Sequence, residues 1–156
     1  MKIVFLDIDG VLNHEKFYKD FHFNKIIKAQ HRKNNIDPRS AKLVVDLCKQ
    51  TGAKIVISSS LRFDGLDELT KRLRIAGIKD KYVLDVCSLE RPHEFSGTNR
   101  GTVIQRYIDE HNIDKYIILD DDTDMLEHQK PYFIKISRWT GFTEVNLKTA
   151  INILKN

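Results

Sequence analysis

Three hydrophobic segments of the sequence end in carboxylate or hydroxyl side chains. Asp7 and Asp9 follow residues 3–6, three serines follow residues 54–57, and three aspartates follow residues 116–119. Brought together, several carboxylates would repel one another and hold raised pKa values unless a cation neutralised them. Mg²⁺ takes oxygen ligands and usually keeps coordination positions for water and a phosphate oxygen. The pattern therefore predicts a magnesium site that handles phosphate groups.

These segments fit strands of a parallel sheet. They are apolar without alternation, as in strands buried on both faces, and residues 82–86 and 132–136 share the pattern. A helix is expected to begin at Asp37-Pro38 and to end at Gly52. Further helical stripes occupy residues 66–76, 103–108 and 147–154. The alternation predicts an α/β fold, a Rossmann-like parallel sheet flanked by helices, whose ligands bind beyond the carboxyl ends of the strands.

Length and composition narrow the class of protein. The 156 residues suit one domain, which we expect to span the chain. No apolar run approaches the roughly 18 residues of a membrane span, and no signal-peptide cleavage region is visible, so we expect a soluble, cytoplasmic protein. No GxxxxGK[ST] or GxGxxG motif occurs, which excludes P-loop kinases and dinucleotide-binding domains.

Several residues with reactive or bulky side chains are given structural interpretations. Cys48 and Cys87 lie far apart and are expected to be buried thiols rather than a disulfide or a zinc site. The six histidines, His14 among them, form no metal-binding pattern and are interpreted as solvent-exposed. Trp139 and the Thr-Gly-Phe-Thr stretch after it are expected to pack in the core.

The net charge of +4 is local. Residues 14–35 hold six Lys or Arg against two acids, so the rest of the chain is neutral. We interpret this stretch as a cap insertion after the first strand. Its lysines alternate with Phe17, Tyr18, Phe21 and Phe23, a mixture that suits single-stranded nucleic acid, whose bases stack on rings and whose phosphates pair with cations. Phe17 and Phe21 also fit one buried helix face, with the lysines solvated, and this is the interpretation we favour.

The motifs together resemble those of the haloacid dehalogenase (HAD) superfamily. FLDIDGVLN at 5–13 is similar to its first motif, ISSSLR at 57–62 to its second, NRGTVI at 99–104 to its basic third and IILDDDTD at 117–124 to its acidic fourth. More closely, nearly the whole chain outside the insertion resembles the small HAD-like domain of Swiss Army Knife RNA repair proteins. Leu61 stands where that family usually has tryptophan. The resemblance implies a magnesium-dependent phosphatase with an aspartyl-phosphate intermediate.

The resemblance also implies roles for individual residues. Asp7 would be the nucleophile that attacks phosphorus, and Asp9 would protonate the leaving alkoxide and then deprotonate the attacking water. The presence of Asp9 favours a phosphatase or phosphotransferase over a dehalogenase. Gly10 would let the backbone approach the phosphate. Ser58 or, in the other register, Ser59 would hydrogen-bond a phosphoryl oxygen.

The cation of the third motif has more than one candidate. Arg100 begins a helix whose N-terminus also favours an anion, and it is our preferred residue. Family members more often use lysine there, so Lys79 and Lys81 are rivals. Arg62 would offer a bidentate fork to phosphate, or be an exposed arginine at a helix start.

Magnesium ligands are expected from both acidic motifs. Besides Asp7 and Asp9, Asp121 matches the second aspartate of the family's paired pattern. Asp120 is the alternative. It is the ligand if the acidic motif is aligned one residue earlier, and Asp124 would then support the ligands without touching the metal.

For the substrate, the local charge and the RNA-repair resemblance indicate a nucleotide or a nucleic-acid phosphate end, with Lys16 and Lys19 among its contacts. Two alternatives stay open. A catalytically silent nucleic-acid-binding module would not need both Asp7 and Asp9. A phospho-acceptor signalling domain would carry its aspartate after a middle strand, where this sequence has serines.

Overall fold

The computed structural model describes residues 1–23, 35–87 and 99–156, with the side chains of residues 21–23 left out of the description. The side chains of Phe21 and Phe23 therefore lie outside the described residues. So do those of His22, His31 and His93.

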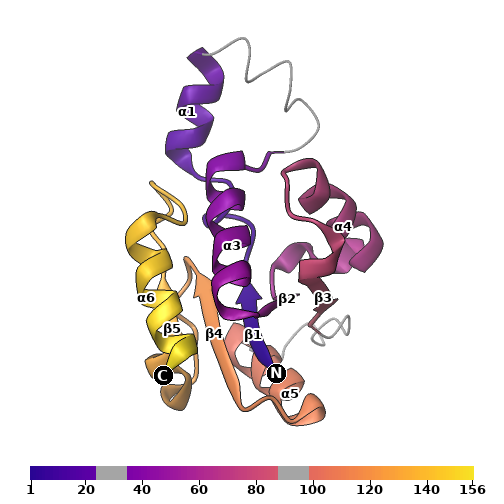
Figure 1. Ribbon diagram of the computed structural model, residues 1–156. Helices are drawn as coiled ribbons and strands as arrows, with labels where there is room; N and C mark the ends of the chain where they lie inside the picture. The colour runs from indigo at the N-terminus through magenta and orange to yellow at the C-terminus, as the bar shows by residue number, and fades with distance from the viewer. Residues whose placement is uncertain (24–34, 88–98) are drawn as a thin grey trace.

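Within the described residues, five strands form one parallel sheet in the order β3-β2-β1-β4-β5 (Figure 1). The strands are β1 (Lys2–Leu6), β2 (Lys54–Ile57), β3 (Val83–Val86), β4 (Lys115–Asp120) and β5 (Phe133–Lys135). The predicted α/β fold, a Rossmann-like parallel sheet flanked by helices, is confirmed. The predicted bounds were too wide at two strand starts. Tyr82 lies in the turn η2 (Asp80–Tyr82), where its amide bonds to the Lys79 carbonyl, and Tyr132 closes the turn η3 (Glu127–Tyr132).

The register of β1 explains why the polar residues meet. Leu6 pairs with Ile57 of β2 and with Leu119 of β4, so the three strands end within one residue of the same level. The Asp7 amide donates to the Leu119 carbonyl at 3.0 Å, and the Ser58 amide donates to the Leu6 carbonyl at 3.0 Å. The residues after each strand are thereby brought to one edge of the sheet.

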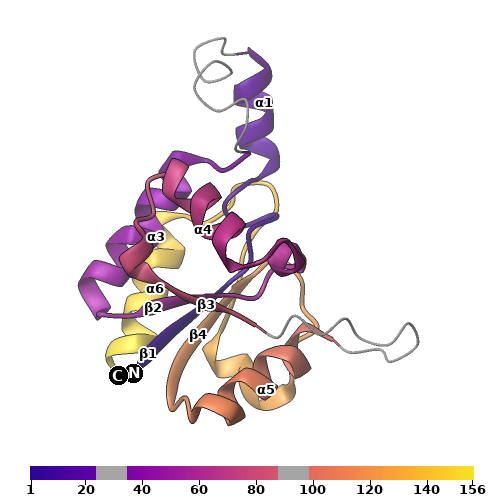
Figure 2. The same cartoon turned by 90° about the vertical axis from the view of Figure 1, so that its right-hand side faces the viewer.

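Helices cover both faces of the sheet (Figure 2). One face packs against α3 (Pro38–Thr51), α4 (Leu66–Ile75) and α6 (Glu144–Lys155), and the other packs against α5 (Arg100–His111). As predicted, Asp37 caps α3 by accepting from the Arg39 amide, and Gly52 ends it in the left-handed conformation. Cys48 and Cys87 are buried free thiols, also as predicted. Among the described helices, none is long and apolar enough to span a bilayer.

The described part of the insertion is α1 (Glu15–Phe23), which stands beyond the carboxyl end of β1 (Figures 1 and 2). Phe17 is 2% exposed, in agreement with a buried helix face, whereas Tyr18 is 39% exposed. The interpretation of His14 as exposed is wrong. Its ring is 4% exposed because it fills the junction of α1 and α3, where Nε2 donates to Asp37 Oδ2 at 2.9 Å.

The prediction of a core position for Trp139 is also wrong. This side chain is 45% exposed, while Phe142, from the same stretch, is buried. The reason is local. The turn from Ser137 to Gly141 is closed by a 2.8 Å hydrogen bond between the Gly141 amide and the Ser137 carbonyl, and it carries Trp139 at its outer side.

Candidate active site

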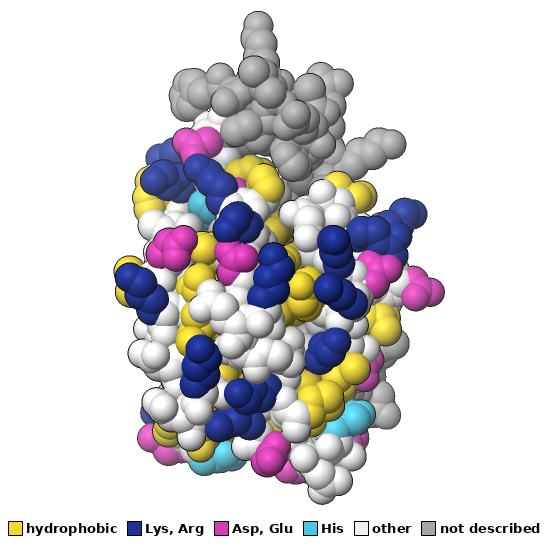
Figure 3. Space-filling model, in the orientation of Figure 1, with side chains coloured by type: hydrophobic (Ala, Val, Ile, Leu, Met, Phe, Trp, Pro, Cys, Tyr) yellow, Lys and Arg dark blue, Asp and Glu magenta, His cyan; other side chains and the backbone are white. Residues whose placement is uncertain are grey.

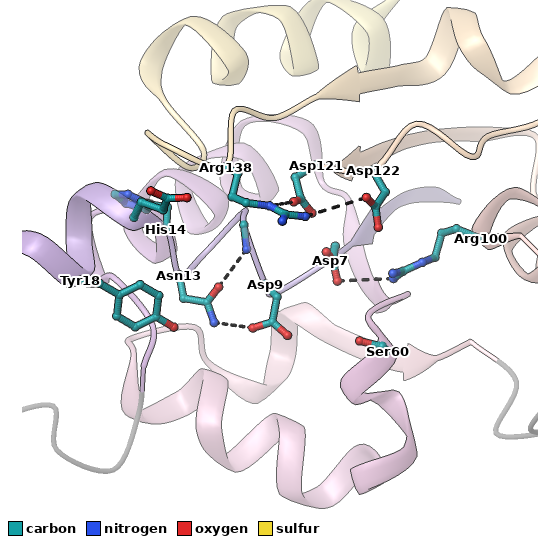
Figure 4. A pocket seen from close by; sticks show the side chains of 12 residues that line it. Asp7, Asp9, Asn13, His14, Tyr18, Ser60, Arg100, Asp121, Asp122 and Arg138 are labelled. Atoms are coloured by element: carbon teal, nitrogen blue, oxygen red, sulfur yellow. Dashed lines mark hydrogen bonds and ion pairs between the residues drawn. The ribbon is translucent and has the colours of Figure 1, made fainter.

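A pocket of about 340 Å³ opens at the carboxyl edge of the sheet, between α1 and the turn that follows β5 (Figure 4). Most of its lining side chains are charged or polar, with five acids and two arginines among them. The lining residues are Asp7, Asp9, Gly10, Asn13, His14, Glu15, Tyr18, Ser60, Arg100, Asp121, Asp122 and Arg138.

Three carboxylates gather at this site, of which Asp7 and Asp121 line the pocket and Asp120 is fully buried. Asp7, Asp120 and Asp121 each offer an oxygen, and these oxygens lie within 4.8 Å of one another. Asp121 approaches so closely because residue 10 is glycine. A Cβ atom on Gly10 would lie 2.5 Å from the Asp121 carboxyl carbon, and the φ of Gly10 is +79°. Asp120 and Asp121, the two alternative ligands from the acidic motif, thus both belong to one cluster.

The electrostatics of the cluster call for a cation. Burial raises the pKa of Asp7 to about 6, although Arg100 and a hydrogen bond from Ser59 act in the opposite direction. Burial, followed by repulsion from Asp7, raises the pKa of Asp120 to about 7. Asp120 Oδ2 is buried and makes no hydrogen bond with the described residues, although Arg100 Nη1 lies 3.7 Å away. An all-oxygen donor set with an unpartnered carboxylate oxygen fits Mg²⁺.

Asp9 lies outside this cluster. Its Oδ1 accepts a 2.6 Å hydrogen bond from Asn13 Nδ2, and Asn13 Oδ1 in turn accepts from the Gly10 amide at 2.9 Å. Of the four predicted metal ligands, the structure brings together the side chains of three and leaves that of Asp9 on the pocket wall. Asn13 therefore fixes the position of Asp9, a contact that the sequence analysis missed although Asn13 ends the first motif.

Arg100 reaches the cluster from the start of α5. Its Nη1 lies 3.4 Å from Asp7 Oδ1, and the same atom donates to the Ser58 carbonyl. The Arg100 amide donates to Asp124 Oδ2 at 2.7 Å, so Asp124 holds the start of the helix behind the site. The rivals Lys79 and Lys81 precede β3 and therefore lie at the opposite edge of the sheet.

The serine run occupies three different environments. Ser58 is fully buried, and its hydroxyl has no hydrogen bond among the described residues. The Ser59 hydroxyl hydrogen-bonds to Asp7 and accepts from the Leu61 amide, capping the turn η1 (Ser60–Asp64). Ser60, which the sequence analysis passed over, is exposed and lines the pocket. Because Ser60 directly follows the two candidate serines, the sequence could have indicated that it lies near the site.

Arg62 is 6% exposed, so its interpretation as an exposed arginine is wrong. Its Nη1 donates to the Ser59 carbonyl at 3.1 Å, and its guanidinium lies 4.4 Å from the Phe63 ring centroid. It does not line the pocket. In this structure Arg62 supports the serine turn from behind.

Arg138 is a further pocket residue that was not predicted from the sequence. Its Nε donates to Asp121 Oδ2 at 2.7 Å, and Nη2 lies 4.0 Å from Asp122 Oδ1 (Figure 4). Arg138 follows β5 in a segment without a recognisable motif, so the sequence offered no signal. Lys16 and Lys19 of α1 are exposed and do not line the pocket. Lys19 instead places Nζ 4.3 Å from the Trp139 ring centroid.

The comparisons with known proteins agree with this geometry. The model of one family, described as the HAD domain in Swiss Army Knife RNA repair proteins, matches residues 3–147. A search of curated proteins and a search of solved structures each found no match.

Proposed function

This chain belongs to the family of HAD domains in Swiss Army Knife RNA repair proteins, and we propose that it is a magnesium-dependent phosphatase acting on nucleotides or nucleic-acid phosphate ends. The observation that carries the proposal is the cluster of Asp7, Asp120 and Asp121, with Arg100 Nη1 3.4 Å from Asp7 Oδ1. Asp7, Asp121 and Arg100 all line a single pocket. Nucleophile, metal ligands and a phosphate-binding cation are then all within reach of one phosphoryl group.

Asp7, Asp120 and Asp121 are the residues that would hold Mg²⁺. When bound, the ion supplies positive charge that offsets the repulsion between the carboxylates and an incoming phosphate. The buried, unpartnered Oδ2 of Asp120 is the observation on which this assignment rests.

In the proposed reaction the Asp7 carboxylate attacks phosphorus, and the bond between phosphorus and the ester oxygen breaks. Asp9, held by Asn13 on the pocket wall, gives its proton to the departing alkoxide. Water then attacks the phosphorus of the aspartyl phosphate and gives a proton to Asp9, and the bond between phosphorus and Asp7 breaks. Arg100, at the helix start, stabilises the charge on the phosphoryl oxygens in both steps.

The substrate class is supported by the charge of the insertion. Residues 14–35 hold the whole net charge of the chain, and their described helix, α1, stands next to the pocket. Of the insertion's six cations, Lys16 and Lys19 lie in the described helix, whose Glu15 and Tyr18 line the pocket, and cations near a phosphatase site favour an anionic substrate.

A phosphate-release assay tests the proposal. The panel contains phosphorylated oligonucleotides, mononucleotides, a sugar phosphate and an aryl phosphate, each with Mg²⁺ or with EDTA. We expect release that requires Mg²⁺ and disappears in Asp7→Asn. The matched control is Asp114→Asn, since the Asp114 side chain is 83% exposed and precedes β4, at the opposite edge of the sheet. Release that persists in Asp7→Asn, or no release from any substrate, would overturn the proposal.

A further inference from the structure

In the proposed reaction the leaving group lies on one particular side of the pocket. Asp9 is the residue that protonates it, so the departing alkoxide must lie at the Asp9 wall. Tyr18 lines the same pocket, and Figure 4 shows its ring on the side of Asp9 and Asn13, away from Arg100. The ring is 39% exposed. A planar aromatic surface is thus available where the leaving group departs.

A second exposed ring lies on the other segment that borders the pocket. Trp139, in the turn after β5, is 45% exposed, and Lys19 Nζ lies 4.3 Å from its ring centroid. Lys19 and Tyr18 are neighbours on α1. A cation, Lys19, therefore accompanies the two exposed rings. Proteins that bind single-stranded nucleic acid use this combination, with rings that stack on bases and cations that pair with the phosphates.

The two segments form one rigid wall. The first amides of α1 are capped by the turn, since the Glu15 amide donates to the Arg138 carbonyl at 3.1 Å and the Lys16 amide donates to the Trp139 carbonyl at 3.0 Å. Behind them His14 fills the junction. A Cβ atom on Gly141, whose φ is +65°, would lie 2.3 Å from the His14 ring. The rings of Tyr18 and Trp139 are therefore carried on backbone that is already fixed, which lowers the entropic cost of binding.

The charge of this face agrees with a polyanionic ligand. Figure 3 shows Lys and Arg side chains, interspersed with acids, over the face of the molecule on the α3 side. Lys16 and Lys19 are exposed on α1, whereas the exposed Arg39 is paired with Asp20 and Asp37.

We propose that Tyr18, Lys19 and Trp139 form a leaving-group subsite that holds the terminal nucleoside and the adjoining nucleotide of a single-stranded nucleic acid with a phosphorylated end. Tyr18 stacks on the terminal nucleoside beside Asp9, Lys19 pairs with the adjoining phosphodiester, and Trp139 stacks on the next base. This proposal rests on the phosphatase proposal and names the part of the chain that selects its substrate.

Trp139 allows a direct test because the chain has a single tryptophan. Its fluorescence is measured in the Asp7→Asn protein with Mg²⁺, so that binding is observed without turnover. The probes are a short single-stranded oligonucleotide with a terminal phosphate, the matching mononucleotide and glucose 6-phosphate. We expect the oligonucleotide to quench the fluorescence and to bind at least about tenfold more tightly than the mononucleotide, and glucose 6-phosphate to cause no quenching.

Variants in the same background separate the contacts. Tyr18→Ala should weaken oligonucleotide binding roughly tenfold, and Tyr18→Phe should restore it because the ring remains. The control Tyr132→Ala removes a tyrosine of similar exposure, 42%, that precedes β5. Lys19→Gln should reduce the slope of log affinity against log salt concentration by about one, the loss of one phosphate contact. Lys148→Gln, an exposed lysine of α6, should leave the slope unchanged.

Quenching by glucose 6-phosphate at the same concentrations as by the oligonucleotide would overturn the subsite. So would a folded Tyr18→Ala protein, verified by circular dichroism, whose affinity for the oligonucleotide is unchanged. Quenching by the oligonucleotide together with absence of phosphate release from the wild-type protein would refute the phosphatase proposal and leave Tyr18, Lys19 and Trp139 as a surface that binds nucleic acid. The two failures are therefore distinguishable.

Discussion

The Asp121 carboxylate lies directly against Gly10, where a Cβ atom would be 2.5 Å from its carboxyl carbon. This contact joins the first motif to the acidic fourth motif, which lies more than a hundred residues further along the sequence. It exists only because residue 10 lacks a side chain and adopts a φ of +79°, a conformation that glycine accepts without strain.

Gly10→Ala is therefore expected to push Asp121 out of the carboxylate cluster. Calorimetric titration should show at least a roughly tenfold weaker affinity for Mg²⁺ than in the wild type. Gly52→Ala is the matched control, because Gly52 has a φ of +74° but nothing within 4 Å of its added Cβ atom. Both variants should lose about 1 kcal/mol of stability from backbone strain. Equal Mg²⁺ affinity in the two variants would show that the contact between Gly10 and Asp121 does not organise the metal site.

Asp120→Asn should stabilise the metal-free protein. The folded pKa of Asp120, about 7, lies above its ordinary value of 3.8. The unfolded chain therefore ionises first, and the wild type loses stability as the pH rises from about 4 to about 7. Thermal unfolding in EDTA should show a higher Tm for Asp120→Asn near neutral pH, with the difference shrinking towards about pH 4.

Mg²⁺ should reverse this order. It is expected to raise the Tm of the wild type and to have a smaller effect on Asp120→Asn, which has lost one of the three carboxylate charges. An Asp120→Asn protein that Mg²⁺ stabilises as much as the wild type would remove Asp120 from the metal site.

The pair of His14 and Asp37 should contribute stability that is lost in acid. Burial acts to raise the pKa of Asp37, but hydrogen bonds from His14 and Arg39 outweigh it and lower the pKa to about 2. A lowered folded pKa gives stability that is present above the ordinary value of 3.8 and is lost as the pH falls towards about 2. Urea unfolding should show wild type and Asp37→Asn differing by about 2 kcal/mol above about pH 5 and converging in acid. A difference that does not depend on pH would mean that the Asp37 charge is not what stabilises the junction.

Arg100→Gln should lower kcat by a factor of about a hundred or more, because the phosphoryl oxygens lose their cation. Lys79→Gln should leave kcat unchanged, since Lys79 precedes β3 at the far edge of the sheet. Steady-state kinetics with a phosphorylated oligonucleotide measure both variants. A larger loss in Lys79→Gln than in Arg100→Gln would contradict the placement of the cation.

The sequence predicted the sheet and the residues at its carboxyl edge well, because both depend on local patterns. Apolar runs marked the five strands, and the residues directly after β1, β2 and β4 had to meet once those strands were parallel. Helix α3 was predicted in the same way, from Asp37-Pro38 at its start and Gly52 at its end.

Residues whose position depends on tertiary packing were predicted poorly. The burial of His14 depends on Asp37 and on the turn after β5, which are distant in the sequence. Arg138 reaches Asp121 from a turn that has no motif. Trp139 looked like a core residue by composition, but the same turn carries it to the surface. None of these positions follows from periodicity or spacing.

The most direct test of the proposed chemistry is to find where phosphate becomes attached to the protein. The wild-type protein is mixed with a phosphorylated oligonucleotide labelled with ³²P at its terminal phosphate, quenched in acid during turnover and digested, and the labelled peptide is sequenced. Label on the peptide that contains Asp7, absent in Asp7→Asn and without Mg²⁺, is the predicted result. Phosphate release during which the label never becomes attached to Asp7 would contradict the proposed mechanism.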